Sequence, residues 1–294
     1  MKQKKQADAV CFGEVLWDIL PAGAVPGGAP VNVAYHLGKQ GIHAAVITRV
    51  GNDDSGRKLT GIFDNKGVDT SWFQVDDKVE TGKVCALPQA NHDVKYEFLQ
   101  PSAWDRIEYL DEHATLIENA SCFIYGTLAL REQQSRNTLF RLLKKATRKI
   151  FDVNLREGYY TKDLLLQLLE EADMVKMNTD ELTLINGWLN GRSGVEEQLR
   201  FIARKFNLVT VVVTLGADGA VMLHNEEVFS VPGIHVPVED TVGSGDAFLA
   251  RLIAGMLSGA APLEALTAAN ALGAFIASKR GACPDYVVEG PVIR

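Results

Sequence analysis

The sequence predicts an α/β protein: a doubly wound, mainly parallel β-sheet flanked by helices, with a small β lid. Short apolar runs alternate along the chain with longer segments whose apolar residues recur at helical spacing. Several short runs, such as 209–214, are apolar on both faces, as strands of a parallel sheet are. Alternation of such strands with helices favours one sheet that is covered by helices on both faces.

The first elements are two strand-like segments and a helix. Residues 9–13 form an apolar run that ends in glycine, and residues 14–18 alternate between apolar and polar side chains. A helix is expected between Pro30 and Gly41, because proline is tolerated in the first turn of a helix and glycine ends one. A strand over 43–50 and a helix over 54–66 follow.

The stretch 68–99 has a different pattern. Its three β-like runs are separated by polar turns, and no helical spacing lies between them. We expect an antiparallel excursion from the α/β layers, which would form the small lid.

From about residue 105 the alternation of strands and helices resumes. The expected strands are 122–126, 150–154, 174–177 and 209–214, followed by a hairpin through 221–223 and 228–229. The expected helices are 131–148, 164–169, 179–188, 195–206 and 263–279. Residues 236–238 read as the end of a further strand, after which a glycine-rich turn at 240–246 opens a helix that ends at Gly259. Neither a repeat nor a linker interrupts the chain, so we expect a single domain over 1–294.

Composition excludes several classes of protein. The chain has 294 residues, of which 47% are hydrophobic and 23% charged, as in an ordinary globular protein. Its net charge of −7 argues against nonspecific binding to nucleic acid or to an anionic membrane. Neither a signal-peptide core nor an apolar run near the ~20 residues of a membrane span is present. The four cysteines are far apart and the six histidines lack metal-ligand spacing, so we expect reduced thiols and a cytoplasmic protein.

Polar or glycine-rich positions follow most of the expected strands, at the edge of the sheet where ligands of such folds bind. These positions are Asp18, Gly27, Gly28, Asn154, Asn178, 214–219 and 240–246. Two of the side chains have alternative interpretations. Asp18 is either a ligand-binding carboxylate or a loop acid. Asn32 either points into the same cleft or is a surface or capping residue.

The turn at 240–246 (Asp-Thr-Val-Gly-Ser-Gly-Asp) carries the clearest chemistry. Its glycines allow a sharp turn, and the N–H groups at the helix start have no intrahelical partner and suit an anion. A carboxylate at Asp246 would repel that anion, unless it takes a proton from a hydroxyl that attacks a bound phosphate. The alternative is a plain helix start with Ser244 or Asp246 as the cap.

Other chemistries fit less well. A Gly-x-x-x-x-Gly-Lys-Ser/Thr loop and a Gly-x-Ser-x-Gly elbow are both absent from the sequence. Phe248 stands where a dinucleotide fingerprint has its third small residue. Phosphoryl transfer with a backbone anion site and a carboxylate base is the reaction that fits.

Two segments, 27–34 and 240–246, closely resemble the two signature regions of the ribokinase-like (PfkB) sugar kinases in order and separation. The elements at 178–181 and 214–216 lie between them, and the chain length agrees. The resemblance implies a ribokinase-like fold with lid segments at about 15–26 and 81–100. It also implies that Asp246 is the general base and that the amides of Gly243, Ser244 and Gly245 form the anion hole. This chain has Ser244 where alanine is common, which a hole made of backbone N–H groups should tolerate.

The resemblance implies three further groups of residues. Those that match sugar contacts are Asp18, Gly28, Asn32 and Arg156. Those that match contacts around the nucleotide, its phosphates and Mg²⁺ are Asn178, Glu181, Thr214, Gly216, Gly219 and Asn270. Those at the positions of a monovalent cation such as K⁺ are Asp240, Val242, Ile276, Lys279, Gly281 and Asp285. Arg156 and Asn270 also have plain interpretations, as a surface arginine and a helix-interior amide.

Residues 13–18, the Gly-Gly-Ala-Pro-x-Asn form and 152–156 look most like bacterial fructokinases. The resemblance therefore implies an ATP- and Mg²⁺-dependent kinase that phosphorylates the 6-hydroxyl of D-fructose, and a homodimer paired through the β lid. The alternatives are a kinase for ribose or 2-keto-3-deoxygluconate, and a non-catalytic sugar or nucleotide sensor. An assay of ATP consumption across a panel of sugars would distinguish them.

Overall fold

The computed structural model describes residues 6–20, 23–88, 94–289 and 292–293. The strands of the main sheet are β1 (Ala9–Phe12), β4 (Ala44–Gly51), β5 (Phe73–Asp76), β8 (Cys122–Gly126), β9 (Lys149–Asp152), β10 (Met174–Asn178), β11 (Thr210–Thr214), β12 (Gly219–His224) and β13 (Glu227–Pro232). The α-helices are α1 (Ala29–Lys39), α2 (Asp54–Asn65), α3 (Asp111–Glu118), α4 (Gln133–Leu143), α5 (Lys162–Glu171), α6 (Thr179–Trp188), α7 (Val195–Phe206), α8 (Ser244–Leu257) and α9 (Pro262–Ala277).

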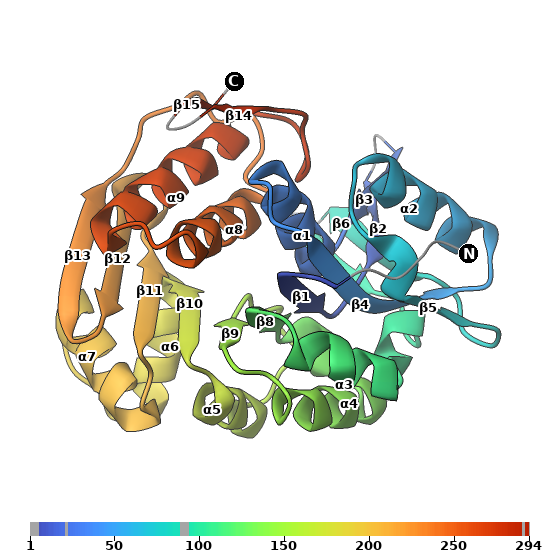
Figure 1. Cartoon of the computed structure of the whole chain (residues 1–294), viewed down its shortest axis with the longest axis horizontal. Helices are drawn as coiled ribbons and strands as arrows, with labels where there is room; N and C mark the ends of the chain where they lie inside the picture. Colours follow the sequence, from blue (N-terminus) through green and yellow to red (C-terminus); the bar gives the residue numbers. More distant parts are fainter. Residues whose placement is uncertain (1–5, 21–22, 89–93, 290–291, 294) are drawn as a thin grey trace.

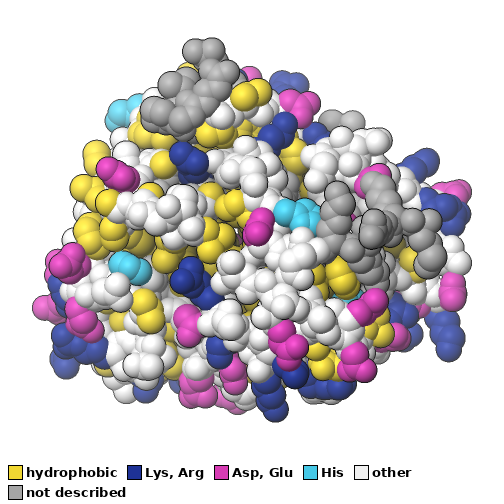
Figure 2. All heavy atoms as spheres, in the orientation of Figure 1, with side chains coloured by type: hydrophobic (Ala, Val, Ile, Leu, Met, Phe, Trp, Pro, Cys, Tyr) yellow, Lys and Arg dark blue, Asp and Glu magenta, His cyan; other side chains and the backbone are white. Residues whose placement is uncertain are grey.

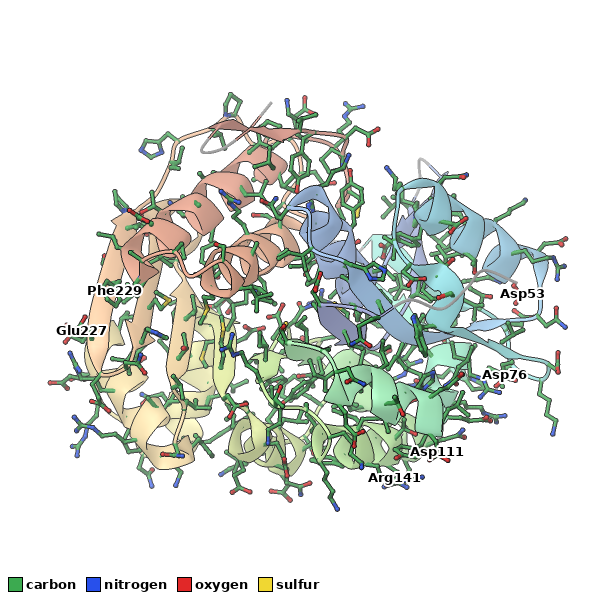
Figure 3. All side chains as sticks on the ribbon, in the orientation of Figure 1. Asp53, Asp76, Asp111, Arg141, Glu227 and Phe229 are labelled. Atoms are coloured by element: carbon green, nitrogen blue, oxygen red, sulfur yellow. The ribbon has the colours of Figure 1, made fainter. Side chains whose placement is uncertain are left out.

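The main sheet has the strand order β13-β12-β11-β10-β9-β8-β1-β4-β5 (Figure 1). Every neighbouring pair is parallel except β11–β12 and β12–β13. Glu227 and Phe229 on β13 lie at one end of the sheet, and Asp76 on β5 lies at the other (Figure 3). The predicted mainly parallel, doubly wound sheet is confirmed.

Helices cover both faces of this sheet. Figure 1 shows α1, α8 and α9 over one face and α3 to α7 over the other. Side chains that alternate along one strand join different cores, because successive residues of a strand point to opposite faces. Val175 of β10 packs in the core on the α3–α7 side, whereas Met174 packs in the core on the α1–α8–α9 side. Burial on both sides explains why these strands are continuous apolar runs.

A second, smaller sheet has the order β3-β2-β6-β7, with β2 (Leu16–Leu20), β3 (Gly23–Gly27), β6 (Gly82–Pro88) and β7 (Val94–Phe98). Its strands lie in the two segments that the resemblance assigns to a lid. The short pair β14 (Val288–Glu289) and β15 (Val292–Ile293) lies apart from both sheets.

Part of the stretch 68–99 differs from the prediction. β5 joins the main sheet parallel to β4, with Thr48 opposite Phe73, so only the later strands of this stretch enter the small sheet. The small sheet is also mixed, because β2 pairs with β6 in parallel. A short apolar run gives no indication of the sheet edge with which it pairs, and this choice depends on the tertiary contacts.

Three local expectations also change. Residues 236–238 are outside any strand, since β13 ends at Pro232 and Pro237 lacks the N–H that a strand ladder needs. Asp18 lies within β2 of the small sheet, and not just beyond a buried strand. The helix α3 has no counterpart among the predicted elements.

The described surface and cysteines agree with the composition. On the face shown in Figure 2, basic and acidic side chains are interspersed. None of the helices in the described ranges is long and apolar enough to cross a membrane. All four cysteines are free thiols, and Cys11 and Cys122 are buried as predicted.

Candidate active site

Two helix starts, those of α1 and α8, form the centre of the site. Gly28 is the N-cap of α1 with φ 125°, and a Cβ there would lie 2.5 Å from the carbonyl oxygen of Glu14. Gly243 is the N-cap of α8 with φ 78°, and a Cβ there would lie 2.6 Å from Cα of Ala282. Both positions therefore need glycine, for its backbone conformation and for the close approach of a neighbouring chain segment.

The two helix starts are joined by a buried hydrogen bond. Asn32 Nδ2 donates to Asp246 Oδ2 over 2.8 Å, and only 8% of Asp246 is exposed. Burial, and next the carboxylate of Asp152, raise the pKa of Asp246 to about 6. The Asn32 bond and the cations of Lys176 and Arg156 oppose that rise. Asp246 is thus a carboxylate held in one orientation, with a pKa close to neutrality.

The predicted anion hole is a helix start that is anchored on two sides. The Ser244 N–H donates to the carbonyl oxygen of Thr241 over 3.2 Å, so this amide already has one acceptor. The Ser244 hydroxyl donates to the carbonyl oxygen of Gly273 on α9 over 3.0 Å. Serine in place of alanine therefore ties the turn to α9, and its side chain is directed away from the anion hole.

A second buried cluster lies next to Asp246. Lys176 Nζ of β10 lies 3.0 and 3.2 Å from the two carboxylate oxygens of Asp152, at the end of β9. Burial alone would lower the pKa of Lys176, but Asp152, Glu181 and Asp246 together raise it above its usual value. A Cβ at Gly245 would lie 3.0 Å from Lys176 Nζ, so the ammonium group lies directly against the turn that opens α8.

A small pocket opens at the carboxyl ends of the central strands. It is lined by Phe12, Glu14, Ala29, Pro30, Val33, Ile124, Tyr125, Gly126, Thr127, Leu128, Asp152 and Asn154. Burial raises the pKa of Glu14 to about 7, and its Oε1 accepts a hydrogen bond of 3.1 Å from the Ala29 N–H. The pocket is thus lined by apolar side chains and a few polar groups, as small-molecule sites are.

Asp18 and Arg156 lie within electrostatic reach of each other. Burial raises the pKa of Asp18 to about 6, against the opposing effect of the Arg156 guanidinium. Arg156 Nη1 donates to Asn154 Oδ1 over 2.8 Å, and Asn154 lines the pocket. A side chain at Gly27 would clash with the carboxylate of Asp18, which explains glycine at that position.

The residues predicted to surround the nucleotide fall into two groups. Asn178 caps α6, and its backbone N–H donates to Glu181 Oε2 over 2.8 Å, so these two residues form a capping box. The other Glu181 carboxylate oxygen accepts from Leu155 N–H over 2.8 Å, which brings α6 to the loop that carries Arg156.

The second group lies at the β12–β13 side of the sheet. Gly219 pairs with Pro232, and Asn270 Nδ2 of α9 donates to the Pro232 carbonyl oxygen over 2.9 Å. Thr214 pairs with Asn178 across β10 and β11, which connects the two groups. Gly216 lies in the intervening turn with φ 60°.

The residues predicted to hold a monovalent cation lie partly together. The Asp240 carboxylate accepts from the N–H groups of Val242 and Gly281, over 3.0 and 3.2 Å. Asp285 lies instead 3.6 Å from Lys39 Nζ on α1. Among the described residues, none of the groups of His, Cys, Asp and Glu side chains is arranged to hold a metal ion by itself.

Sequence reasoning missed four residues of this site. They are Glu14, Asp152, Lys176 and Cys283, whose Sγ lies 3.3 Å from Asn32 Oδ1. Of the four, only Lys176 could have been predicted from the sequence. It lies inside an apolar strand, and lysine is rarely buried without a partner. The other three become recognisable only when their neighbours are placed.

Comparison with known proteins agrees with this geometry. Residues 21–287 match the family described as pfkB family carbohydrate kinase. Fructokinase-1 of Oryza sativa is 29% identical over 314 aligned positions, which cover 97% of this chain and 96% of the relative. A protein of Pyrococcus horikoshii that is described as an uncharacterized sugar kinase is 32% identical over 275 positions, covering 87% of this chain and 82% of the relative. The fructokinase of Vibrio cholerae, solved with fructose, ADP and calcium, superposes with a TM-score of 0.79 at 27% identity, covering 95% and 96% of the two chains.

Proposed function

The chain belongs to the pfkB family of carbohydrate kinases, and we propose that it transfers the γ-phosphate of ATP to the 6-hydroxyl of D-fructose. The relatives that carry the name fructokinase support the choice of sugar. The observation that carries the proposal is the hydrogen bond from Asn32 to Asp246, because it joins the two helix starts that this chemistry needs.

Asp246 acts as the general base. Its pKa of about 6 leaves it mainly ionised at neutral pH and able to accept a proton from the attacking hydroxyl. The amide of Asn32 holds one carboxylate oxygen, so the other oxygen is free to face the sugar. Such positioning, together with charge stabilisation, is what phosphoryl transfer requires from a protein.

The start of α8 receives the transferred phosphoryl group. The first N–H groups of a helix and its dipole favour an anion, and Gly243 and Gly245 keep this start free of side chains. Mg²⁺ would be held mainly by ATP phosphates and water, with Asn178 and Glu181 near it, and would neutralise phosphate charge. A monovalent cation such as K⁺ is assigned to the region of Asp240 and Gly281, which are joined by a hydrogen bond, and a double mutant of the Vibrio cholerae relative was solved with potassium.

We assign the sugar contacts to Gly28, Asp18 and Arg156. Gly28 precedes the pocket residue Ala29, and Arg156 donates a hydrogen bond to the pocket residue Asn154. Carboxylate and amide groups of this kind select for hydroxyls, because a substrate that lacks the hydroxyl leaves them unpaired. The small sheet closes over the pocket as a lid and excludes water. Exposed apolar side chains on it, Leu20 and Val25, support a homodimer that pairs through this sheet.

A second candidate substrate is a sugar acid such as 2-keto-3-deoxygluconate. The observation that favours it is Arg156, whose guanidinium group lies beside the pocket and is suited to bind a carboxylate. The two candidates differ in the group that Arg156 would bind, which is a carboxylate in the sugar acid and a hydroxyl in fructose.

The test is an ATP-consumption assay with fructose, ribose and 2-keto-3-deoxygluconate, followed by NMR identification of the phosphorylated carbon. The proposal expects the highest kcat/KM with fructose and a product phosphorylated at carbon 6. A higher kcat/KM with either other acceptor, or a product phosphorylated elsewhere on fructose, contradicts it.

A further inference from the structure

Three carboxylates and one ammonium group are buried together beside the start of α8. The carboxylates belong to Asp152, Glu181 and Asp246, with 4%, 7% and 8% of each residue exposed, and the ammonium group is that of Lys176, also 7% exposed. They come from β9, α6, α8 and β10, so the cluster joins four elements of the site. Charges this deeply buried are costly unless they are paired, which points to a task beyond stability.

The position of Lys176 is specific. Its Nζ is held between both oxygens of Asp152, at 3.0 and 3.2 Å, and lies 3.0 Å from where a side chain on Gly245 would begin. Residue 245 is the last of the three residues to which we assign the anion hole, and it lies in the first turn of α8. The ammonium group therefore places a positive charge directly beside the start of α8.

We propose that Lys176 is a positioning residue for phosphoryl transfer, which supplies positive charge beside the α8 turn and keeps Asp246 ionised while Asp152 holds it in place. The proposal rests on the assignment of Asp246 as the base. Negative charge collects at this turn when the phosphoryl group arrives, and a fixed cation in a dry site stabilises that charge without reorganising.

Other charged and titratable groups also face Asp246. They are Cys11 on β1, Glu14 after β1, Asp152 on β9, Arg156 after β9, and Cys283 near the C-terminus. Arg156 is exposed to solvent, so Lys176 is the buried cation of the set. Its effect on Asp246 must be measured without leaving Asp152 unpaired, because an orphaned carboxylate would perturb the site by itself.

The experiment therefore compares D152N with the double variant D152N/K176M. Both lack the Asp152 carboxylate, and they differ only in the ammonium group. With the sugar that the wild-type enzyme phosphorylates fastest, we expect kcat of the double variant to fall about 10- to 100-fold below that of D152N. The KM for ATP should change little. Removing a cation disfavours the ionised form of Asp246, so the acid limb of kcat/KM should lie at higher pH in the double variant.

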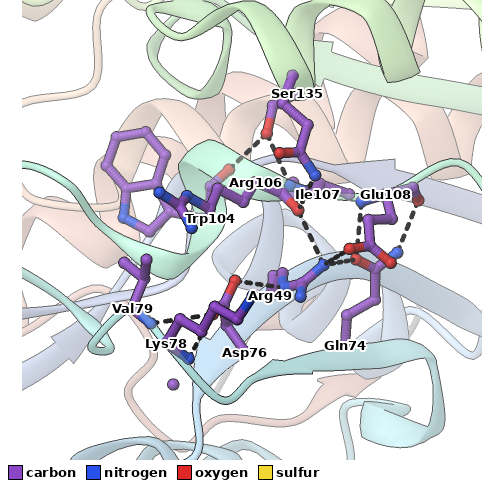
Figure 4. A network of polar contacts seen from close by, with 12 residues as sticks. Arg49, Gln74, Asp76, Lys78, Val79, Trp104, Arg106, Ile107, Glu108 and Ser135 are labelled. Carbon is purple, nitrogen blue, oxygen red and sulfur yellow. Dashed lines mark hydrogen bonds and ion pairs between the residues drawn. The ribbon is translucent and has the colours of Figure 1, made fainter.

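A matched control comes from a second buried ion pair. Arg49 Nε lies 3.0 Å from Asp76 Oδ2 at the β4–β5 edge, in a network that also includes Glu108 (Figure 4). D76N and D76N/R49M repeat the same pair of changes at the far end of the sheet. They should alter the melting temperature and leave kcat and the pH profile unchanged.

Equal kcat and equal acid limbs in D152N and D152N/K176M overturn the proposal. It is also overturned if D76N/R49M loses as much activity for the same loss of stability. A wild-type enzyme that prefers a sugar other than fructose contradicts the proposed substrate alone, since the comparison then uses that sugar.

Discussion

Asn32 and Asp246 are 214 positions apart in the chain, yet the amide of one donates to the carboxylate of the other over 2.8 Å. The bond forms because the β1–α1 connection and the start of α8 meet on one side of the central strands. The donor, Asn32, lies in the first turn of helix α1, whose N-cap Gly28 has a backbone conformation that favours glycine.

Replacing Asp246 with asparagine should lower kcat by roughly 10²–10⁴, because asparagine cannot accept the hydroxyl proton. Binding of ATP, measured by calorimetry, should be nearly unchanged, because the N–H groups of the turn remain. Turnover close to that of the wild type would show that another group is the base.

The value of kcat/KM should fall on the acid side with a midpoint near pH 6, where Asp246 takes up a proton. N32L removes a hydrogen bond that lowers the pKa of Asp246, so its acid limb should move to higher pH. Measuring kcat/KM between about pH 5 and 9 gives the acid limb of the wild type and of N32L. An acid limb at the same pH in N32L as in the wild type would show that Asn32 does not lower the pKa of the base.

Asp18→Ala should raise the KM for the sugar about 10- to 100-fold, which is the effect of one lost hydrogen bond to a charged group. The value of kcat should change much less, because Asp18 is assigned to binding. D54A, at an exposed carboxylate on α2, serves as the control and should leave both constants unchanged. A normal KM in D18A would remove Asp18 from the sugar site.

His36 should make the protein less stable in acid. Its Nε2 lies 2.9 Å from the Ala282 carbonyl oxygen and its Nδ1 lies 2.8 Å from the Tyr286 hydroxyl, and burial lowers its pKa to about 4. Between this value and the ~6.5 of an unfolded histidine, only the unfolded chain takes up the proton. Stability is therefore complete above about pH 6.5 and is lost as the pH falls towards 4, by at most ~3 kcal/mol.

Urea unfolding of wild type and H36Q at pH 5 and 7.5 tests this. The difference in unfolding free energy between the two pH values should shrink in H36Q. The control H235Q, at an exposed histidine, should keep the wild-type difference. Equal differences in all three proteins would rule out His36 as the source.

Gly243→Ala should impair both folding and activity. The backbone at Gly243 has φ 78°, and the new Cβ would meet Cα of Ala282 at 2.6 Å. Gly259→Ala is a matched control, because Gly259 has φ 76° with nothing within 4 Å of the new Cβ. We expect the control to cost ~1–3 kcal/mol of backbone strain and to keep its activity, whereas G243A should lose more of both. Equal losses in the unfolding free energy would show that the backbone at Ala282 moves away from the new Cβ at little cost.

Much of the fold was predictable from the sequence, because burial on both faces of a parallel sheet leaves apolar runs such as 209–214. Helices α6 and α7 begin and end where their spacing predicts. The strand β5 was placed wrongly, because pairing with β4 depends on contacts between distant segments. Helix α3 was missed, since its short apolar pattern is weak.

The candidate site, like the fold, has features that the sequence predicted and others that only the tertiary structure revealed. The sequence by itself indicated where the backbone must turn, because Gly28 and Gly243 precede expected helices, and both have a positive φ in the structure. That an anion binds at the second turn, with Asp246 as the base, stays a prediction. Only the tertiary structure decided which charges share one buried environment. Lys176 and Asp152 lie on neighbouring strands, and their effect on Asp246 arises from distance and burial, which depend on how the elements pack and not on any local pattern of residues.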